Sequence, residues 1–257
     1  MTSAAFAVKK KSGSKDKTLN AVFYLFLLIF ALICLFPLLL VVISSFTDEQ
    51  TLLMNGYSLF PKKWSVAAYR LIFATGTIFD AYKVTVFITV VGTALSMLLT
   101  SATAYSISIK TFRSRNRIAM FMYFTMLFGG GLVASYLLIS KYLGMRDTIW
   151  VLIIPGLVSP WNTLLMRNFF SDIPTSLSES ATLDGAGDLC ILFKIILPIS
   201  KPAIATIGLF YALGYWNQWY RALLYIDKSS LFPLQYLIMT IVRNANFASA
   251  ELSLIHI

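Results

Sequence analysis

Five apolar stretches, each long enough to cross a lipid bilayer as a helix, constrain this sequence more than any other feature. The hydrocarbon core of a bilayer is about 30 Å thick, and a helix needs roughly 20 apolar residues to span it. Only 12% of the 257 residues are charged, whereas about a quarter are charged in a typical soluble domain. The sequence therefore predicts an all-α, polytopic transmembrane helical bundle. The predicted spans are residues 21–45, 84–109, 118–140, 148–166 and 203–226.

Basic residues beside the spans predict their orientation. Residues 1–20 carry five lysines and one acid, so the positive-inside rule predicts a cytoplasmic basic tail. With alternate crossings, residues 110–117, which carry four basic residues and no acid, also lie in the cytoplasm. Residues 46–82 then form an external loop. Residues 83–226 form a core of four transmembrane helices with a cytoplasmic loop at 171–202.

Charge, cysteine and histidine content favour no other class of protein. The formal net charge of +10 comes from basic clusters beside the spans, so we expect no nucleic-acid partner. Cys34 and Cys190 have neither paired nor metal-ligand spacing, and His256 is the single histidine. We therefore expect no metal site and no catalytic cluster.

The sequence lacks the groups needed for ion coupling or ATP hydrolysis. Their interiors contain no Asp, Glu, Lys or His, while Arg167 and Arg221 fall toward span ends, where long side chains reach the headgroups. The sequence also has no G-x-x-x-x-G-K-[ST] nucleotide-binding loop. We therefore expect neither ion coupling nor ATP hydrolysis by this chain, which is not predicted to be an enzyme.

Small residues and prolines predict how the spans pack. One face of the second span carries a small residue at every fourth position, which allows another helix to approach closely. Prolines inside spans predict kinks whose freed carbonyls are satisfied by neighbouring side chains. The small residues are Gly92, Ser96, Thr100, Ala104 and Ser108, and the prolines are Pro37, Pro155 and Pro160.

The loop after the fourth predicted span has the pattern of a rigid cytoplasmic element. Pro174 suits the first turn of a helix, and Ser176 with Glu179 three residues later forms a capping-box pattern. Gly185 and Gly187 are expected to end that helix.

A second, amphipathic helix is predicted next, with Asp188 as its cap. Its apolar face is expected to lie against the membrane helices. Pro198 and Pro202 end it and turn the chain into the fifth span. The predicted apolar face consists of Leu189, Leu192, Phe193, Ile196 and Leu197.

This loop resembles the signature of permease subunits of binding-protein-dependent ABC importers, which reads E-A-A-x-x-x-G, continued as D-G-A, an amphipathic segment and L-P-x-x-x-P. Ser180 stands where the family has alanine. The resemblance extends from about the second span to the fifth and is greatest to the carbohydrate-uptake branch, which includes the maltose-type smaller permease and Gram-positive polysaccharide and oligosaccharide permeases. The matching residues are Glu179, Ser180, Ala181, Asp184, Gly185 and Ala186, then Leu197, Pro198 and Pro202.

The resemblance implies a type I ABC importer permease fold, a location in the bacterial cell membrane, and import of a sugar or oligosaccharide. Residues 175–190 would be the coupling helix that docks on a separate ATPase, with Pro174, Phe193, Leu197, Pro198 and Pro202 as support. The implied partners are a second homologous permease, an ATPase dimer that holds ATP and Mg, and an extracellular sugar-binding lipoprotein. This chain itself would bind no cofactor. Two alternatives are a secondary carrier or channel for a small polar solute, and an ABC permease for a non-sugar substrate.

A substrate path is less well specified. Aromatic and amide side chains near the ends of two spans can stack on and hydrogen-bond a sugar, although an interfacial aromatic belt is the favoured explanation. The candidates are Trp161, Asn162, Trp216, Asn217 and Trp219.

The C-terminal region is expected to depart from the family pattern of six spans. The residues after Arg243 are too few and too mixed for another crossing, and the last seven resemble translated adapter sequence. We therefore expect residues 227–257 to form an external segment with a truncated end, and the sixth span to be missing.

Overall fold

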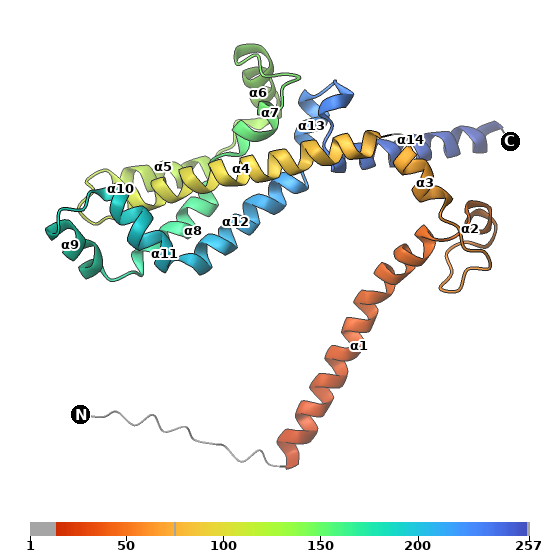
Figure 1. Ribbon diagram of the computed structural model, residues 1–257, viewed down its shortest axis with the longest axis horizontal. Helices are drawn as coiled ribbons and strands as arrows, with labels where there is room; N and C mark the ends of the chain where they lie inside the picture. Colours follow the sequence, from red (N-terminus) through yellow and green to blue (C-terminus); the bar gives the residue numbers. More distant parts are fainter. Residues whose placement is uncertain (1–13, 75, 256–257) are drawn as a thin grey trace. The chain divides into compact units, whose positions relative to one another are not determined.

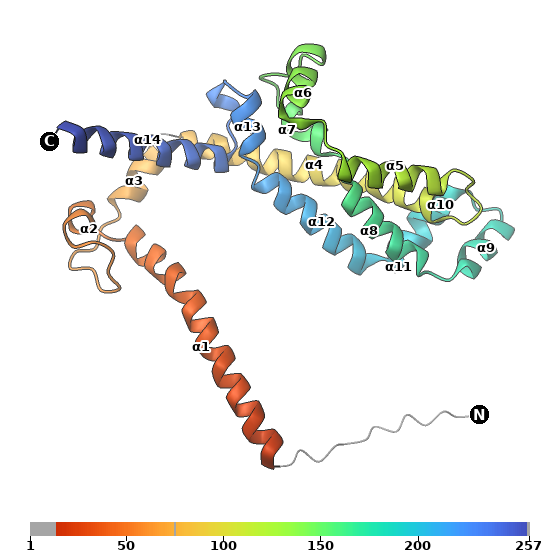
Figure 2. The same ribbon diagram turned by 180° about the vertical axis from the view of Figure 1, so that it is seen from behind.

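The computed structural model describes residues 14–74 and 76–255. The chain separates into two compact units between residues 75 and 76 (Figures 1 and 2). The described residues form helices and connecting turns, and their only β-type pairing is an isolated bridge between Thr47 and Trp64. The predicted all-α class is therefore confirmed.

The first unit contains one long helix and two short ones. Helix α1 spans Ser14–Ser45, α2 spans Glu49–Asn55 and α3 spans Ala67–Ala74. Tyr69 of α3 stacks on Phe46, and its hydroxyl lies 2.8 Å from the Ser45 hydroxyl, which ties α3 to the end of α1. The apolar side chains of α1 between Leu19 and Ser45 are not buried within the chain, as expected for a helix whose surroundings are lipid or another subunit.

Helix α4 (Thr77–Ser108) is the central element of the second unit. It packs most extensively against α12 (Lys201–Trp216) and α8 (Pro160–Ser171), and both lie alongside it in the two views (Figures 1 and 2). The helix begins seven residues before the predicted start at Val84, because Asp80 and Lys83 form an exposed ion pair in its first turns instead of ending it.

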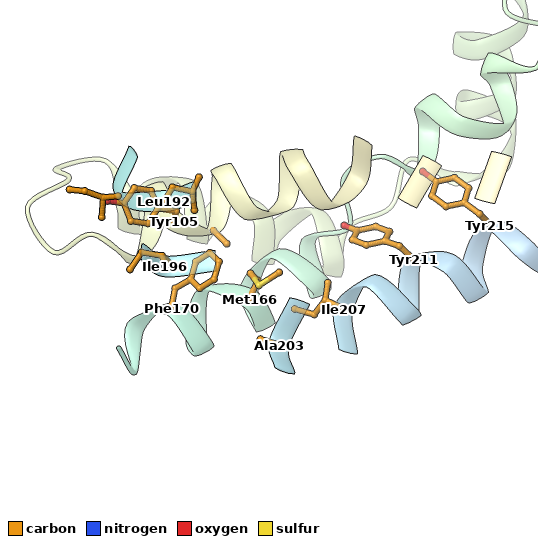
Figure 3. Close-up of a cluster of buried hydrophobic side chains, with 11 residues drawn as sticks. Tyr105, Met166, Phe170, Leu192, Ile196, Ala203, Ile207, Tyr211 and Tyr215 are labelled. Carbon is orange, nitrogen blue, oxygen red and sulfur yellow. The ribbon is translucent and has the colours of Figure 1, made fainter. Parts of the chain in front are cut away.

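The predicted stripe of small residues on α4 is the face that α12 contacts. The Tyr215 hydroxyl lies 3.0 Å from Ser96 Oγ, and the Tyr211 hydroxyl lies 2.7 Å from Thr100 Oγ1. A Cβ atom added at Gly92 would come within 2.7–2.8 Å of the Tyr215 ring, so this contact requires glycine. Figure 3 shows both tyrosines extending from α12 toward α4. The prediction of close helix packing along this face is confirmed.

The third predicted span is strongly bent. Helices α5 (Arg115–Leu127) and α6 (Gly131–Leu137), the latter continued by a π-helical turn to Tyr142, meet at 112°. The break falls at the three successive glycines, residues 129–131, of which Gly131 has a φ of 75°. Glycine permits this left-handed conformation without a steric penalty.

The fourth and fifth predicted spans are also divided. The fourth contains α7 (Trp150–Ile153), a 3-10 turn at Ile154–Gly156, and α8, which begins at Pro160 after an extended Ser159. The fifth contains α12 and then α13 (Tyr220–Tyr225), separated at Asn217–Trp219. Proline lacks an N–H and fixes φ, which explains the interruptions at Pro155 and Pro160.

A further helix lies where the sequence predicted an external segment. Helix α14 (Leu234–Ile255) has 22 residues and contacts α4. Its first residue is fixed by tertiary contact, because the backbone N–H of Leu234 donates to Thr85 Oγ1 at 2.8 Å. The hydropathy pattern did not reveal this helix, since its sequence is too mixed for an isolated apolar span.

Two helices in the described residues are long and apolar enough to cross a membrane, Leu19–Ser45 and Thr77–Ser108. The number rises to four if each bent helix pair is one span: α5 with α6, and residues 188–199 with α12. The sequence predicted five spans, and residues 148–166 are not among these four because they contain no continuous helix.

Candidate functional site

The predicted coupling segment begins with helix α9 (Thr175–Leu183). Its N-cap is Pro174, whose φ of −57° suits entry into a helix, and no side chain caps it. The predicted capping box of Ser176 and Glu179 is therefore wrong. The helix starts at Thr175, which places Ser176 inside the first turn, where its hydroxyl is no longer at the cap position.

Helix α9 ends in a Schellman motif centred on Gly185. The Ala186 N–H donates to the Ala181 carbonyl at 2.9 Å, and the Gly185 N–H donates to the Thr182 carbonyl at 3.0 Å. Gly185 has a φ of 83°, a conformation that favours glycine over residues with a Cβ. The glycine elbow predicted at Gly185 is confirmed. Gly187 has an extended conformation and instead caps the next helix.

The signature residues divide between an inner and an outer face of the loop. Ala181 and Ala186 are half-buried and pack against the hydrophobic core formed by α4, α8 and α12. Glu179, Ser180 and Asp184 are exposed, and so is the apolar side chain of Leu183, at 89%. The small residues thus fix the loop to the bundle, while its polar groups and one leucine remain available to a partner.

The following helical segment buries three of the five residues of the predicted apolar face, Leu192, Ile196 and Leu197. It consists of α10 (Asp188–Ile191), a π-helical stretch at Leu192–Ile196 and α11 (Leu197–Ile199). Leu189 and Phe193 were expected on the buried face but are 70% and 53% exposed. A π-helical stretch bonds i to i+5, which rotates the later residues relative to a regular α-helix. The residues buried or packed against the core are Ile191, Leu192, Ile195, Ile196 and Leu197.

Asp188 is the first residue of α10 and not its cap, because Gly187 occupies the cap position. Its carboxylate still lies where the helix dipole favours negative charge. Pro198 lies within α11, and Pro202 lies in the first turn of α12. The chain bends by 90° between residues 199 and 201, so the predicted turn into the fifth span is confirmed. Figure 3 shows Leu192 and Ile196 packed close to Tyr105 and Phe170.

A cleft of about 810 Å³ opens beside α9. Glu179, Leu183 and Asp188 line one part of it, while the basic residues Arg115 and Arg167 line the part formed by α5 and α8. The cleft therefore presents acidic and basic groups next to the coupling segment.

A second pocket lies where the 3-10 turn after α7 meets α8, α12 and α13. Helix α7 ends at Ile153, and two of its last carbonyls accept hydrogen bonds from side chains more than 60 residues later in the sequence. The Tyr215 hydroxyl donates to the Ile153 carbonyl at 3.2 Å, and Gln218 Nε2 donates to the Leu152 carbonyl at 2.5 Å. The expectation that carbonyls near Pro155 are satisfied by neighbouring helices is confirmed.

Arg221 lines this pocket. Its Nη1 donates to Gln218 Oε1 at 2.8 Å. A Cβ atom at position 156 would lie 2.6 Å from the same nitrogen, so Gly156 makes room for the guanidinium. The pocket measures about 170 Å³, and Ser159 and Asn162 also line it.

Only one of the five predicted substrate residues, Asn162, lines this pocket. Trp161 and Trp219 are exposed, and Asn217 bonds the Leu213 carbonyl and Gln235. Trp216 contacts Tyr82 edge-on, with ring centroids 5.8 Å apart. None of these four residues lines the pocket.

Gln218 and Arg221 line the pocket but were not predicted from the sequence as site residues. The sequence signal for this pair is an arginine in an otherwise uncharged span, with a glutamine three residues before it. Arg221 was interpreted as a side chain that reaches the headgroups. The structure instead turns it into the bundle, because the chain breaks between α12 and α13.

This arrangement of apolar helices, with an exposed helical elbow after α8, defines a polytopic membrane protein. No family model matches the chain. It is 44% identical over 228 residues to the polygalacturonan/rhamnogalacturonan transport system permease YtcP of Bacillus subtilis, covering 89% of this chain and 79% of that one. It is 41% identical over 203 residues to the protein LplC of the same organism, covering 79% and 68%.

A solved structure agrees. A bacterial ABC transporter involved in the import of the acidic polysaccharide alginate has a chain that matches with a TM-score of 0.82 and 32% identity, covering 94% of this chain and 87% of that one. The chain belongs to the carbohydrate-uptake permease subunits of ABC importers. The resemblance inferred from residues 179–202 is thus confirmed.

Proposed function

We propose that this chain is one of two homologous permease subunits of an importer that moves an oligosaccharide or polysaccharide fragment into the cytoplasm, driven by a separate ATPase dimer. That dimer binds ATP and Mg, and an extracellular sugar-binding lipoprotein delivers the cargo. The N-terminus and α9 lie on the cytoplasmic side. The functions of the similar permease of Bacillus subtilis and of the alginate importer support a saccharide cargo.

The single observation that carries this proposal is the elbow formed by α9 and Gly185. A movement of the ATPase is transmitted to the membrane helices only if the connecting segment is rigid. The Schellman bonds at the end of α9 hold that segment, and the half-buried Ala181 and Ala186 connect it to the core. Glu179, Asp184 and the exposed Leu183 then form the contact surface for the ATPase.

Co-purification tests the contact. Glu179→Gln and Leu183→Asp are expected to lower recovery of the ATPase with the permease by about tenfold and to abolish ATP-driven uptake, because buried interface contacts of this kind contribute on the order of 1–3 kcal/mol each. Insertion into the membrane should stay the same. Ser176→Ala is the matched control, since Ser176 is an exposed residue of the same helix. Undiminished uptake by both variants would contradict the proposal.

Labelling tests the orientation. Cys34 and Cys190 are exposed and free, so both are first replaced by serine. A cysteine at Ser180 should then react with a membrane-impermeant maleimide only in inside-out vesicles. A cysteine at Ser58, an exposed residue of the predicted external loop, should react only in intact cells. The opposite pattern would overturn the assignment.

A further inference from the structure

Arg221 is a half-buried cation in the fifth predicted span, residues 203–226, which carries no other charged side chain. A charged side chain within a membrane helix costs free energy unless it has ion-pair or hydrogen-bond partners. Such residues commonly mark a substrate path. The ion pairs among residues 14–74 and 76–255 join Lys63 to Asp48, Lys83 to Asp80 and Arg146 to Asp227. None of these pairs includes Arg221.

Gln218 holds the guanidinium of Arg221 in a defined orientation. The Gln218 amide donates to the Leu152 carbonyl, which leaves its oxygen directed at Arg221 Nη1. An arginine has five N–H donors, and this contact uses one of them. The guanidinium packs against Gly156, where an added Cβ atom would come within 2.6 Å of Nη1 and 3.3 Å of Nη2. The arrangement therefore positions the arginine and keeps most of its donors available.

The pocket around Arg221 has the chemistry of a small sugar subsite. Hydroxyl and amide groups come from Ser159 and Asn162, and Tyr211 and Tyr215 supply aromatic rings. Its volume of about 170 Å³ is below the roughly 300–1,000 Å³ of pockets that enclose a drug-sized ligand. It thus suits one unit of a longer chain, or one edge of that unit.

The geometry points to Arg221 as the residue that selects saccharides bearing a carboxylate, with Gln218 as its positioning residue. A guanidinium binds a carboxylate through two parallel N–H···O bonds, whereas a neutral hydroxyl or ester accepts only weaker single bonds. This inference rests on the proposed function, because it places a subsite for a uronic acid unit on the path of an imported saccharide. It adds to that function a class of cargo and the group that recognises it.

The test uses the assembled transporter with its partner permease, ATPase and binding protein, reconstituted in proteoliposomes. Uptake of tri-galacturonate is compared with uptake of its methyl ester, which keeps the three sugar units and replaces each carboxylate with a neutral, slightly larger ester group. The wild type should favour the acid. Arg221→Gln should lower the ratio of acid to ester uptake by about tenfold or more, since a charge-assisted bidentate pair is lost. Arg221→Lys should retain part of the preference.

The control and the opposing outcomes separate selection from folding. Arg243→Gln removes an exposed arginine of α14 and should leave the ratio unchanged. Recovery of each variant with the ATPase verifies assembly. Equal loss of both substrates in Arg221→Gln, an unchanged ratio, or wild-type preference for the ester would each overturn the inference while the proposed function stands. ATP-independent uptake, or no uptake of any saccharide by the wild type, would overturn the proposed function itself.

Discussion

The hydroxyl of Tyr215 on α12 lies 3.0 Å from Ser96 Oγ on α4, and the Tyr215 ring sits over Gly92 one turn earlier. Two residues 119 positions apart are thereby joined in a buried contact. A bulky aromatic side chain fits there only because the facing helix carries small residues at four-residue intervals. The same hydroxyl also donates to the Ile153 carbonyl, so Tyr215 holds the end of α7 against α12.

Replacing Gly92 with alanine should destabilise the transporter by about 1–3 kcal/mol, because the added Cβ overlaps the Tyr215 ring and forces α4 and α12 apart. Thermal unfolding of the detergent-purified complex measures the effect. Gly208→Ala on α12 is the matched control. Its Cβ would meet only Met97 Sδ at 3.9 Å, an ordinary contact. A stability of Gly92→Ala equal to that of Gly208→Ala would count against this packing.

Gly185→Val should strain the end of α9 by about 1–2 kcal/mol, because a β-branched residue poorly adopts a φ of 83°. There is open space at this position, so the cost comes from the backbone alone. We expect ATP hydrolysis to continue while uptake falls severalfold. Uptake by Gly185→Asn should lie between that of the wild type and that of Gly185→Val, because asparagine tolerates the left-handed region. Gly187→Ala, with a negative φ, should transport normally.

Gln218→Leu should destabilise the bundle by about 1–3 kcal/mol, because the Leu152 carbonyl loses its donor inside the protein. Asn217→Leu is the neighbouring control, since Asn217 is exposed and bonds a carbonyl of its own helix. Thermal unfolding in detergent compares the two variants. A loss for Asn217→Leu as large as that for Gln218→Leu would contradict the role assigned to the buried amide.

The loop before α7 should open on acidification. Asp147 Oδ1 accepts hydrogen bonds from the Asp227 and Lys228 N–H groups, and these bonds lower the pKa of the Asp147 carboxyl below its ordinary value. A lowered folded-state pKa means that the stabilisation is fully present above the unfolded value of about 3.9. It is lost as pH falls through the folded value. Hydrogen exchange at Asp227 and Lys228 should therefore accelerate only below about pH 4.

Asp147→Asn provides the comparison for this pH effect. Asparagine tolerates the φ of 56° at this position and keeps one carbonyl acceptor, but it does not titrate. Its exchange at Asp227 and Lys228 should be faster than wild type at pH 7 and should show no added step in the acid range. An identical acid step in Asp147→Asn would assign the effect to another group.

Several features of the coupling segment were predictable because they depend on local chemistry. A left-handed helix end favours glycine wherever the chain lies, so Gly185 was identified from its place after the predicted helix. The cap predicted at Ser176 is wrong, because a capping box and an N-terminal proline compete for the same helix start. Pro174 occupies the cap position, so the helix begins at Thr175, two residues earlier than a cap at Ser176 requires.

Periodicity by itself determined that this chain is a bundle of apolar helices, that one face of α4 accepts another helix, and that a stiff elbow follows α8. Each of these follows from residues within a few turns of one another. Only the tertiary structure decided that Leu189 and Phe193 are exposed, where α14 begins, and that Arg221 faces a pocket instead of the headgroups. Those outcomes depend on hydrogen bonds and packing between segments far apart in the chain, such as Leu234 with Thr85 and Gln218 with Leu152. Hydropathy contains no information about such pairs.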